Sequence, residues 1–217
     1  MQYFNLHTHQ FSAQEEILEL VNQYPLEFNQ AIPWYSIGIH PWKINSETLA
    51  SELDIIAEKL LMPNCLVLGE CGLDKRIETP LDLQVQVFEQ QLLLAEKFRK
   101  PVVIHCVAAY SELIQIKKKL QISVPMILHG FSKNAATAQQ LLEHGFYLSF
   151  GKYLLRNPEL SEVFKNIPDQ CFFLETDTIE ESITDVYLRA ADCKSYSVAQ
   201  IQQIIAENFE KVFIQTT

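Results

Sequence analysis

The chain has 217 residues, of which 48% are hydrophobic and 20% are charged, so it is long and apolar enough to bury a substantial core. Its 27 acidic residues outnumber 17 basic ones, which gives a formal net charge of −10. Tight binding to long nucleic acids depends largely on neutralising phosphates with basic side chains. This balance therefore disfavours an extended nucleic-acid interface and is compatible only with a short or transient contact.

Short β-rich apolar runs alternate with longer segments of helical periodicity along the chain. The predicted strands are residues 3–6, 34–39, 66–69, 101–104, 126–128, 147–150 and 171–174. The predicted helices are residues 46–61, 81–98, 109–120, 135–144, 158–165, 183–191 and 198–212. In the second helix, for example, apolar residues at 81, 85, 88, 92 and 95 form one stripe. The alternation has no composition break, so it predicts one α/β domain over residues 1–217 with a parallel sheet.

Residues 17–21 fit either a helix or a strand. The segment is short and Pro25 follows soon after, which favours a strand. A strand here would bring the count to eight, the number of a complete TIM-type (β/α) barrel.

Nothing in the sequence indicates a membrane or an export route. The apolar runs are too short to cross a bilayer, and the first residues lack the basic start and apolar core of a signal peptide. Five cysteines form no C-x-x-C pair, which disfavours a zinc ribbon or a disulfide framework. We expect a cytoplasmic protein without membrane contact or an obligate protein partner.

Residues that commonly bind metals lie at the ends of five predicted strands. They are His7 and His9, then Glu70, His105, His129 and Asp177. The carboxyl ends of parallel barrel strands converge on one rim, and residues two apart on a strand share a face. Four imidazoles and two carboxylates suit divalent Zn, Mn or Mg. Six ligands exceed the three that usually hold one catalytic zinc, so we expect two ions and a bridging carboxylate.

Two cysteines directly follow members of this set. Cys71 comes after Glu70 and Cys106 comes after His105. Because strand side chains alternate between faces, we expect both thiols to point away from the metal site and to pack in the interior.

Seven sequence blocks resemble those of the TatD nucleases, in the same order and over essentially the whole chain. They are NLHTHQF (5–11), GIHPW (38–42), GECGLD (69–74), PVVIHC (101–106), LHGFS (128–132), LETD (174–177) and NFEKVF (208–213). The resemblance implies a barrel-fold, divalent-metal hydrolase, and several members of that family remove nucleotides from DNA. It also implies that His7, His9 and Asp177 hold the first metal. Glu70 would bridge to a second metal, whose ligands His105 and His129 would complete.

The chain departs from the family pattern at three places. Asn5 stands where the family usually has Asp, and the interval from His9 to Glu70 is short, which indicates a trimmed second β/α unit. After Asp177, where DNA-processing members usually have a Pro- and Arg-containing loop, TIEESITDVY (178–187) carries three acids and no base. These departures bear on the substrate more than on the chemistry.

Four further residues are open to two interpretations each. His40 either contacts substrate or has a turn-capping or packing role. Asp74 either orients Lys75 or a ligand, or it stabilises its loop. Glu175 lies one layer below Asp177 and is interpreted as a partner of a ligand rather than as a ligand. Trp42 packs in the interior or borders the pocket.

The sequence thus predicts a two-metal hydrolase that cleaves phosphoester bonds, as a deoxyribonuclease or phosphodiesterase, by means of a metal-bound hydroxide. Asp177 is the candidate general base and Glu70 the bridging carboxylate. Short or single-stranded DNA, or another small phosphoester, is the expected substrate. Two alternatives stay open: hydrolysis of a carboxylic ester, lactone or amide, and a metal-binding homologue without turnover. A polymerase-and-histidinol-phosphatase-type enzyme would have a third early His, and Phe11 occupies that position.

Overall fold

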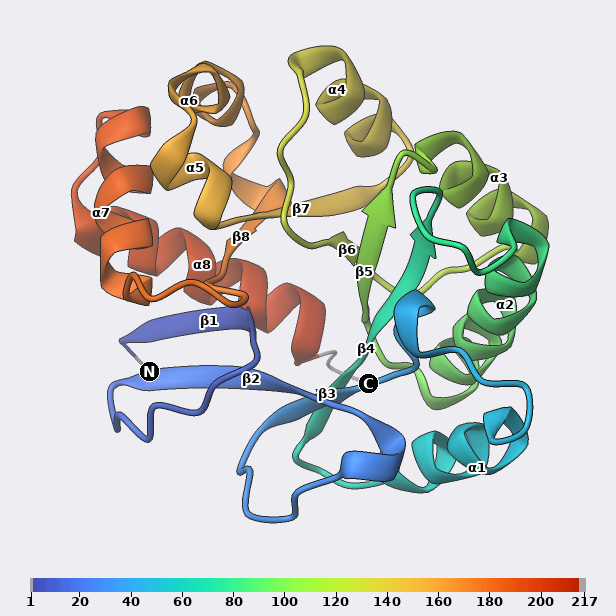
Figure 1. Cartoon of the computed structure of the whole chain (residues 1–217). Coiled ribbons are helices and arrows are strands. Elements are labelled where there is room, and N and C mark those ends of the chain that lie inside the picture. Colours follow the sequence, from blue (N-terminus) through green and yellow to red (C-terminus); the bar gives the residue numbers. More distant parts are fainter. Residues whose placement is uncertain (1, 215–217) are drawn as a thin grey trace. The chain divides into compact units, whose positions relative to one another are not determined.

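The computed structural model describes residues 2–214 and forms two compact units. Unit 1 contains the residues up to Leu20 and those from Leu128 onward, and unit 2 contains Val21–Ile127. Eight strands follow one another in the sheet in chain order, β1 to β8, and the chain passes between the units within β2 and β6 (Figure 1). The pairings of β2 with β3, β3 with β4, β4 with β5 and β7 with β8 are parallel.

Unit 2 consists of strands covered by long helices. Its elements are the end of β2 (Ile17–Gln23), β3 (Tyr35–Ile37), α1 (Leu49–Lys59), β4 (Cys65–Asp74), α2 (Leu81–Phe98), β5 (Val102–Val107), α3 (Tyr110–Leu120) and the start of β6 (Met126–Leu128). Helices α2 and α3 lie side by side against β4 and β5 (Figure 1). The apolar stripe of α2 is buried there through Phe88 and Leu92. Both helices end at a residue with left-handed backbone, Arg99 (φ 52°) and Gln121 (φ 54°).

Two glycines of strand β4 leave no room for a side chain against β5. A Cβ atom on Gly69 would collide with the Val103 carbonyl oxygen, and one on Gly72 would collide with the His105 carbonyl oxygen. The register between the two strands shifts between Leu68 and Cys71, as in a β-bulge. This irregular stretch contains the candidate ligand Glu70 and sets the direction of its side chain.

Unit 1 contains the first and last strands and the remaining helices. Its elements are β1 (Tyr3–Thr8), the start of β2, the end of β6, α4 (Ala135–Glu143), β7 (Phe146–Phe150), α5 (Lys152–Arg156), α6 (Pro158–Lys165), β8 (Phe172–Leu174), α7 (Ile183–Lys194) and α8 (Val198–Phe213). Helices α7 and α8 each begin with a capping box, formed by Ser182 with Asp185 and by Ser197 with Gln200. Both helices pack against β1 and β8.

The predicted elements agree with the observed ones, with informative differences. Residues 17–21 belong to strand β2, as favoured, and the connection from β2 to β3 contains only the short 3₁₀ helix Pro25–Glu27, which confirms the trimmed second β/α unit.

The predicted placement of two ligands at strand ends was wrong. Glu70 lies inside β4, which continues to Asp74, and His105 lies inside β5, which continues to Val107. Pairing between these two strands extends both of them beyond what the local sequence predicts. That the chain is one domain stays a prediction.

Among residues 2–214, no helix combines the length and the apolar character needed to cross a membrane.

Candidate metal centre

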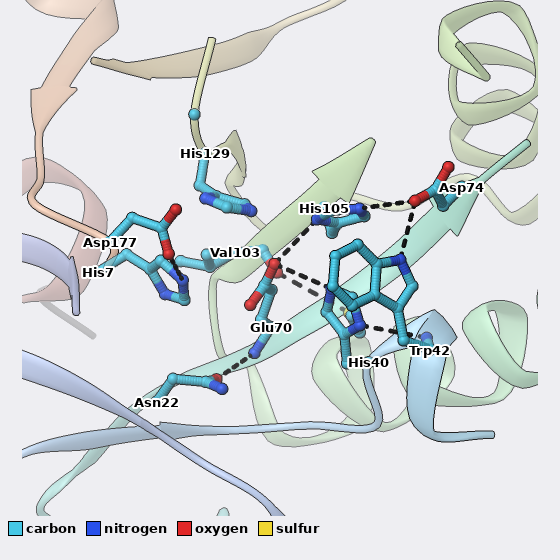
Figure 2. Close-up of polar contacts among 12 residues, drawn as sticks. His7, Asn22, His40, Trp42, Glu70, Asp74, Val103, His105, His129 and Asp177 are labelled. Atoms are coloured by element: carbon cyan, nitrogen blue, oxygen red, sulfur yellow. Dashed lines mark hydrogen bonds and ion pairs between the residues drawn. The ribbon is translucent and has the colours of Figure 1, made fainter. Parts of the chain in front are cut away.

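Three predicted ligands of unit 1 converge at the end of β1. Strand alternation puts His7 and His9 on one face, and the Nε2 atoms of these residues lie 3.8 and 3.5 Å from Asp177 Oδ1. Two N or O ligands of one tetrahedral zinc lie about 3.3–3.5 Å apart, because each is about 2.0–2.2 Å from the ion. The three side chains are thus spaced as ligands of a common divalent ion (Figure 2 shows His7 and Asp177).

The backbone holds Asp177 against β1. The Asp177 N–H donates to the His7 carbonyl (2.9 Å), and the His9 N–H donates to the Asp177 carbonyl (3.1 Å). Asp177 has a left-handed backbone (φ 53°), which a short polar residue tolerates better than most. Its side chain is 31% exposed, whereas the His7 side chain is fully buried. Asp177 therefore combines a fixed backbone with a carboxylate that water can reach.

Asn5 connects β1 with the segment before Asp177. Its Nδ2 donates to Thr176 Oγ1 (2.8 Å), and its Oδ1 accepts from the Thr176 N–H (3.1 Å). Asn5 and Thr176 are both buried. The residue that departs from the family pattern is thus a clamp that fixes the position of the neighbouring ligand.

His129, directly after β6, is oriented by a buried carboxylate. Its Nδ1 lies 3.4 Å from Glu175 Oε1, and that oxygen also accepts from the Gly130 N–H (2.7 Å). Burial by itself raises the pKa of Glu175, but hydrogen bonding and charge interaction with His129 outweigh it, so the pKa is lowered. A carboxylate on Nδ1 leaves Nε2 as the ligand nitrogen, which is the usual arrangement behind a metal-bound histidine. The interpretation of Glu175 as a partner of a ligand fits this geometry.

In unit 2, Glu70 lies between two imidazoles. Its Oε1 is 3.2 Å from His40 Nε2 and 3.0 Å from His105 Nδ1, and its side chain is 5% exposed (Figure 2). The Glu70 N–H donates to Asn22 Oδ1 (2.7 Å), which fixes the backbone at this point. Ligand atoms of His40, Glu70 and His105 lie close enough together to hold an ion.

The hydrogen bonds of His40 make it a donor rather than a ligand. Its Nδ1 accepts from the Trp42 N–H (3.1 Å) at the start of the 3₁₀ helix Pro41–Lys43, so this nitrogen carries the lone pair. A neutral imidazole has one N–H, which must then be on Nε2, facing Glu70. His40 therefore caps a turn, one of its two predicted roles, and presents a proton to the Glu70 carboxylate. Sequence reasoning could not find this second contact.

His105 has a carboxylate on each side. Its Nε2 lies 3.5 Å from Asp74 Oδ2, and its Nδ1 faces Glu70. A neutral imidazole donates to only one of them, so the other nitrogen presents a lone pair, which a cation would satisfy. Asp74 also accepts from Trp42 Nε1 (2.8 Å) and from the Arg76 N–H (2.8 Å). Burial by itself raises the pKa of Asp74. The hydrogen bonds from Trp42 and Arg76, together with the interaction with His105, outweigh burial and lower this pKa. Asp74 is thus suited to orient His105, as Glu175 orients His129.

Of the two cysteines next to the ligands, Cys71 packs in the interior as predicted, whereas Cys106 is only half-buried. Cys71 is fully buried, and its thiol contacts the Val103 carbonyl oxygen (3.9 Å). Burial raises the pKa of Cys106 to about 12, which keeps it a neutral thiol.

Comparison with known proteins identifies the family. A family model described as TatD related DNase matches residues 2–214. The chain belongs to this family. The 3'-5' ssDNA/RNA exonuclease TatD of Salmonella typhimurium is 29% identical over 169 residues, which cover 75% of this chain and 62% of the relative. The uncharacterized metal-dependent hydrolase YabD of Bacillus subtilis is 29% identical over 195 residues, which cover 82% of this chain and 76% of YabD.

The fold comparison agrees with the family. The TatD homologue YJJV from Escherichia coli has a TM-score of 0.82 over 99% of both chains at 18% identity. With eight strands that alternate with helices, the TatD family protein has the TIM-type (β/α) barrel that the sequence predicts. The match covers less than two thirds of the length of the Salmonella exonuclease.

Proposed function

We propose that this TatD family protein is a two-metal hydrolase that cleaves phosphoester bonds, with short or single-stranded nucleic acid or another small phosphoester as substrate. The observation that carries the proposal is the spacing of His7, His9 and Asp177 Oδ1, which suits ligands of one ion better than a direct hydrogen bond. Relatives named as ssDNA/RNA exonucleases and as a metal-dependent hydrolase support the reaction class.

The donor chemistry fits Mg, Mn or Zn in both units. In the proposed assignment, His7, His9 and Asp177 would hold the first ion. Glu70, His105 and His129 would hold the second, with Glu70 proposed as the bridging carboxylate. The bound ions would lower the pKa of a water and offset the negative charge that develops on the phosphoryl oxygens.

The chain's own residues have distinct roles in this proposal. Asp177, whose carboxylate is 31% exposed, accepts the proton of the attacking water. The His40 Nε2–H forms a hydrogen bond to the Glu70 carboxylate and so holds it in place. Asp74 and Glu175 fix the rings of His105 and His129. Asp177 thus moves a proton, whereas His40, Asp74 and Glu175 hold other side chains in position.

The acidic segment after Asp177 favours a short substrate. It carries Glu180 and Glu181, and Glu181 forms a two-pronged ion pair with Arg156 of α5 (2.7 and 2.9 Å). The charge of Arg156 is thereby matched by Glu181. A long phosphate backbone would therefore find little electrostatic attraction at this segment. A cytoplasmic location and the absence of an obligate protein partner also stay predictions.

The proposal is tested with purified protein on short single-stranded DNA and on bis-p-nitrophenyl phosphate, with Mg, Mn or Zn added. His7→Ala and Glu70→Ala serve as controls, one in each unit. We expect metal-dependent cleavage that both variants lose. Two bound metals without phosphoester cleavage would contradict the proposed reaction. A panel of carboxylic esters, lactones and amides would then separate the alternative hydrolase from a homologue without turnover.

A further inference from the structure

Trp42 is a large aromatic side chain that lies exposed beside the Glu70 and His105 side chains. It is 65% exposed, compared with 39% for Trp34, the other tryptophan. Its ring centroid is 5.0 Å from that of His40 and 5.8 Å from that of His105, at interplanar angles of 88° and 76° (Figure 2). Trp42 thus contacts His40 and His105, the two imidazoles that flank Glu70.

Two hydrogen bonds hold Trp42 in this exposed position. The indole Nε1–H donates to Asp74 Oδ2 (2.8 Å), and Asp74 is 3% exposed. The backbone N–H donates to His40 Nδ1 (3.1 Å). An exposed ring fixed at its polar edge and at its backbone loses little further entropy when a flat ligand stacks on it.

The charges around this site favour stacking over phosphate pairing. Lys43, the next residue, pairs with Glu27 (2.8 Å) and lies over the Tyr24 ring (3.7 Å to the centroid). Lys75 pairs with Glu112 (2.6 Å). Both lysines are thus already matched to carboxylates. Stacking of a base on an aromatic ring requires no cation and tolerates any sequence.

We propose that Trp42 is a stacking platform for one nucleobase of single-stranded nucleic acid, held beside Glu70 and His105. This rests on the proposed function, because it specifies which substrate that site accepts. It distinguishes a nucleic acid from a small ester, since only the nucleic acid offers a flat base. A stacking contact of this kind would also be open to a chain with net charge −10, because it requires no cation.

The first test measures binding directly. In a Trp34→Phe background Trp42 is the sole tryptophan, so its fluorescence reports contact with the base. Metal-loaded protein is titrated with phosphorothioate-linked oligothymidylate, which resists hydrolysis, and with an abasic oligonucleotide of equal length and linkage. We expect the first to quench the fluorescence at concentrations about tenfold lower than the second. Equal quenching by both, or none by either, would overturn the proposal.

The second test separates the aromatic face from the indole N–H. Trp42→Phe and Trp42→Leu both lose the bond to Asp74, but only Trp42→Phe keeps a ring. We expect the ratio of KM for abasic to intact DNA to be about 10 in the wild type, to stay high in Trp42→Phe and to fall to about 1 in Trp42→Leu. Trp34→Leu, which removes the other tryptophan, serves as the control and should keep the wild-type ratio. An unchanged ratio in Trp42→Leu would contradict the platform.

The fluorescence test is independent of the proposed reaction, because it measures binding alone, whereas the KM test requires cleavage. Base-dependent quenching without phosphoester cleavage would support the platform and contradict the hydrolase. Phosphoester cleavage with no preference for intact over abasic DNA would support the hydrolase and overturn the platform.

Discussion

The ligand clusters of the two units use the same residue types in different settings. In unit 1, Asp177 lies on a loop after β8 and its side chain is 31% exposed. In unit 2, Glu70 lies inside β4, and its side chain is 5% exposed and flanked by His40 and His105. An exposed carboxylate can exchange protons with solvent, whereas a buried one between two imidazoles is held in position by them. The difference supports the proposed roles, in which Asp177 moves a proton and Glu70 organises the site.

The largest expected effect comes from removing the Glu70 carboxylate. Glu70→Gln keeps the shape of the side chain but removes the negative charge that would hold the ions. We expect kcat/KM to fall by about 10³-fold or more, since such stabilisation is worth several kcal/mol. Glu52→Gln, which changes another buried glutamate of unit 2, is the matched control and should leave turnover unchanged. Nearly full activity in Glu70→Gln would contradict the role of this residue.

Replacing the exposed carboxylate should affect turnover more than binding. In Asp177→Asn we expect kcat to fall about 10²–10⁴-fold with KM within a few-fold, because the proton acceptor is lost. Steady-state kinetics on bis-p-nitrophenyl phosphate measure both quantities, with the exposed Asp192→Asn as control. A wild-type rate in rigorously repurified, metal-reconstituted Asp177→Asn would rule out the assignment.

The carboxylates behind the histidines provide a symmetrical test of the two units. Asp74→Asn and Glu175→Gln each remove a charge that orients a ligand ring, so each should weaken metal affinity about 10–100-fold. Competition with a fluorescent chelator measures the affinity. If one substitution has no effect, the corresponding carboxylate does not orient its histidine and the similarity between the units fails.

The smallest expected effect concerns the Asn5 clamp in unit 1. Asn5→Leu removes two hydrogen bonds and leaves the buried Thr176 hydroxyl without its amide donor, while the Thr176 N–H keeps the His7 carbonyl, so the loss should be about 1–3 kcal/mol of unfolding free energy. Asn5→Asp can still accept from the Thr176 N–H and hydroxyl, so it should restore part of the loss. Urea unfolding measures both variants. A loss in Asn5→Leu below about 0.5 kcal/mol, the size of a neutral surface change, would show that the clamp is not needed.

Local periodicity was sufficient to predict most of the elements. The limits of α2, α6 and β6 match the prediction, and β2 was favoured correctly from its length and the following proline. The continuation of β4 past Glu70 could not be predicted, because Gly72 normally indicates a turn and the pairing partner is on β5. Helix α5 spans only Lys152–Arg156, too short for a periodic signal.

Residue types predicted the candidate ligands, but the contacts that support these ligands depend on the fold. The pairs Trp42–Asp74 and Asn5–Thr176 join residues 32 and 171 positions apart, and no spacing rule links them. The Nδ1 atom of His40 carries the lone pair because the following turn directs the Trp42 N–H toward it. Roles that depend on which nitrogen carries a proton are not encoded in residue type.

The most direct test of the two-metal account is the metal stoichiometry of active protein. Apoprotein is titrated with Zn or Mn while bound metal and phosphodiesterase activity are followed in the same samples, for the wild type and for His9→Ala and His105→Ala. The account predicts that wild-type activity reaches its plateau at two ions per chain and that each variant retains about one tight ion. Full activity at one ion per chain, or without any metal, would contradict it.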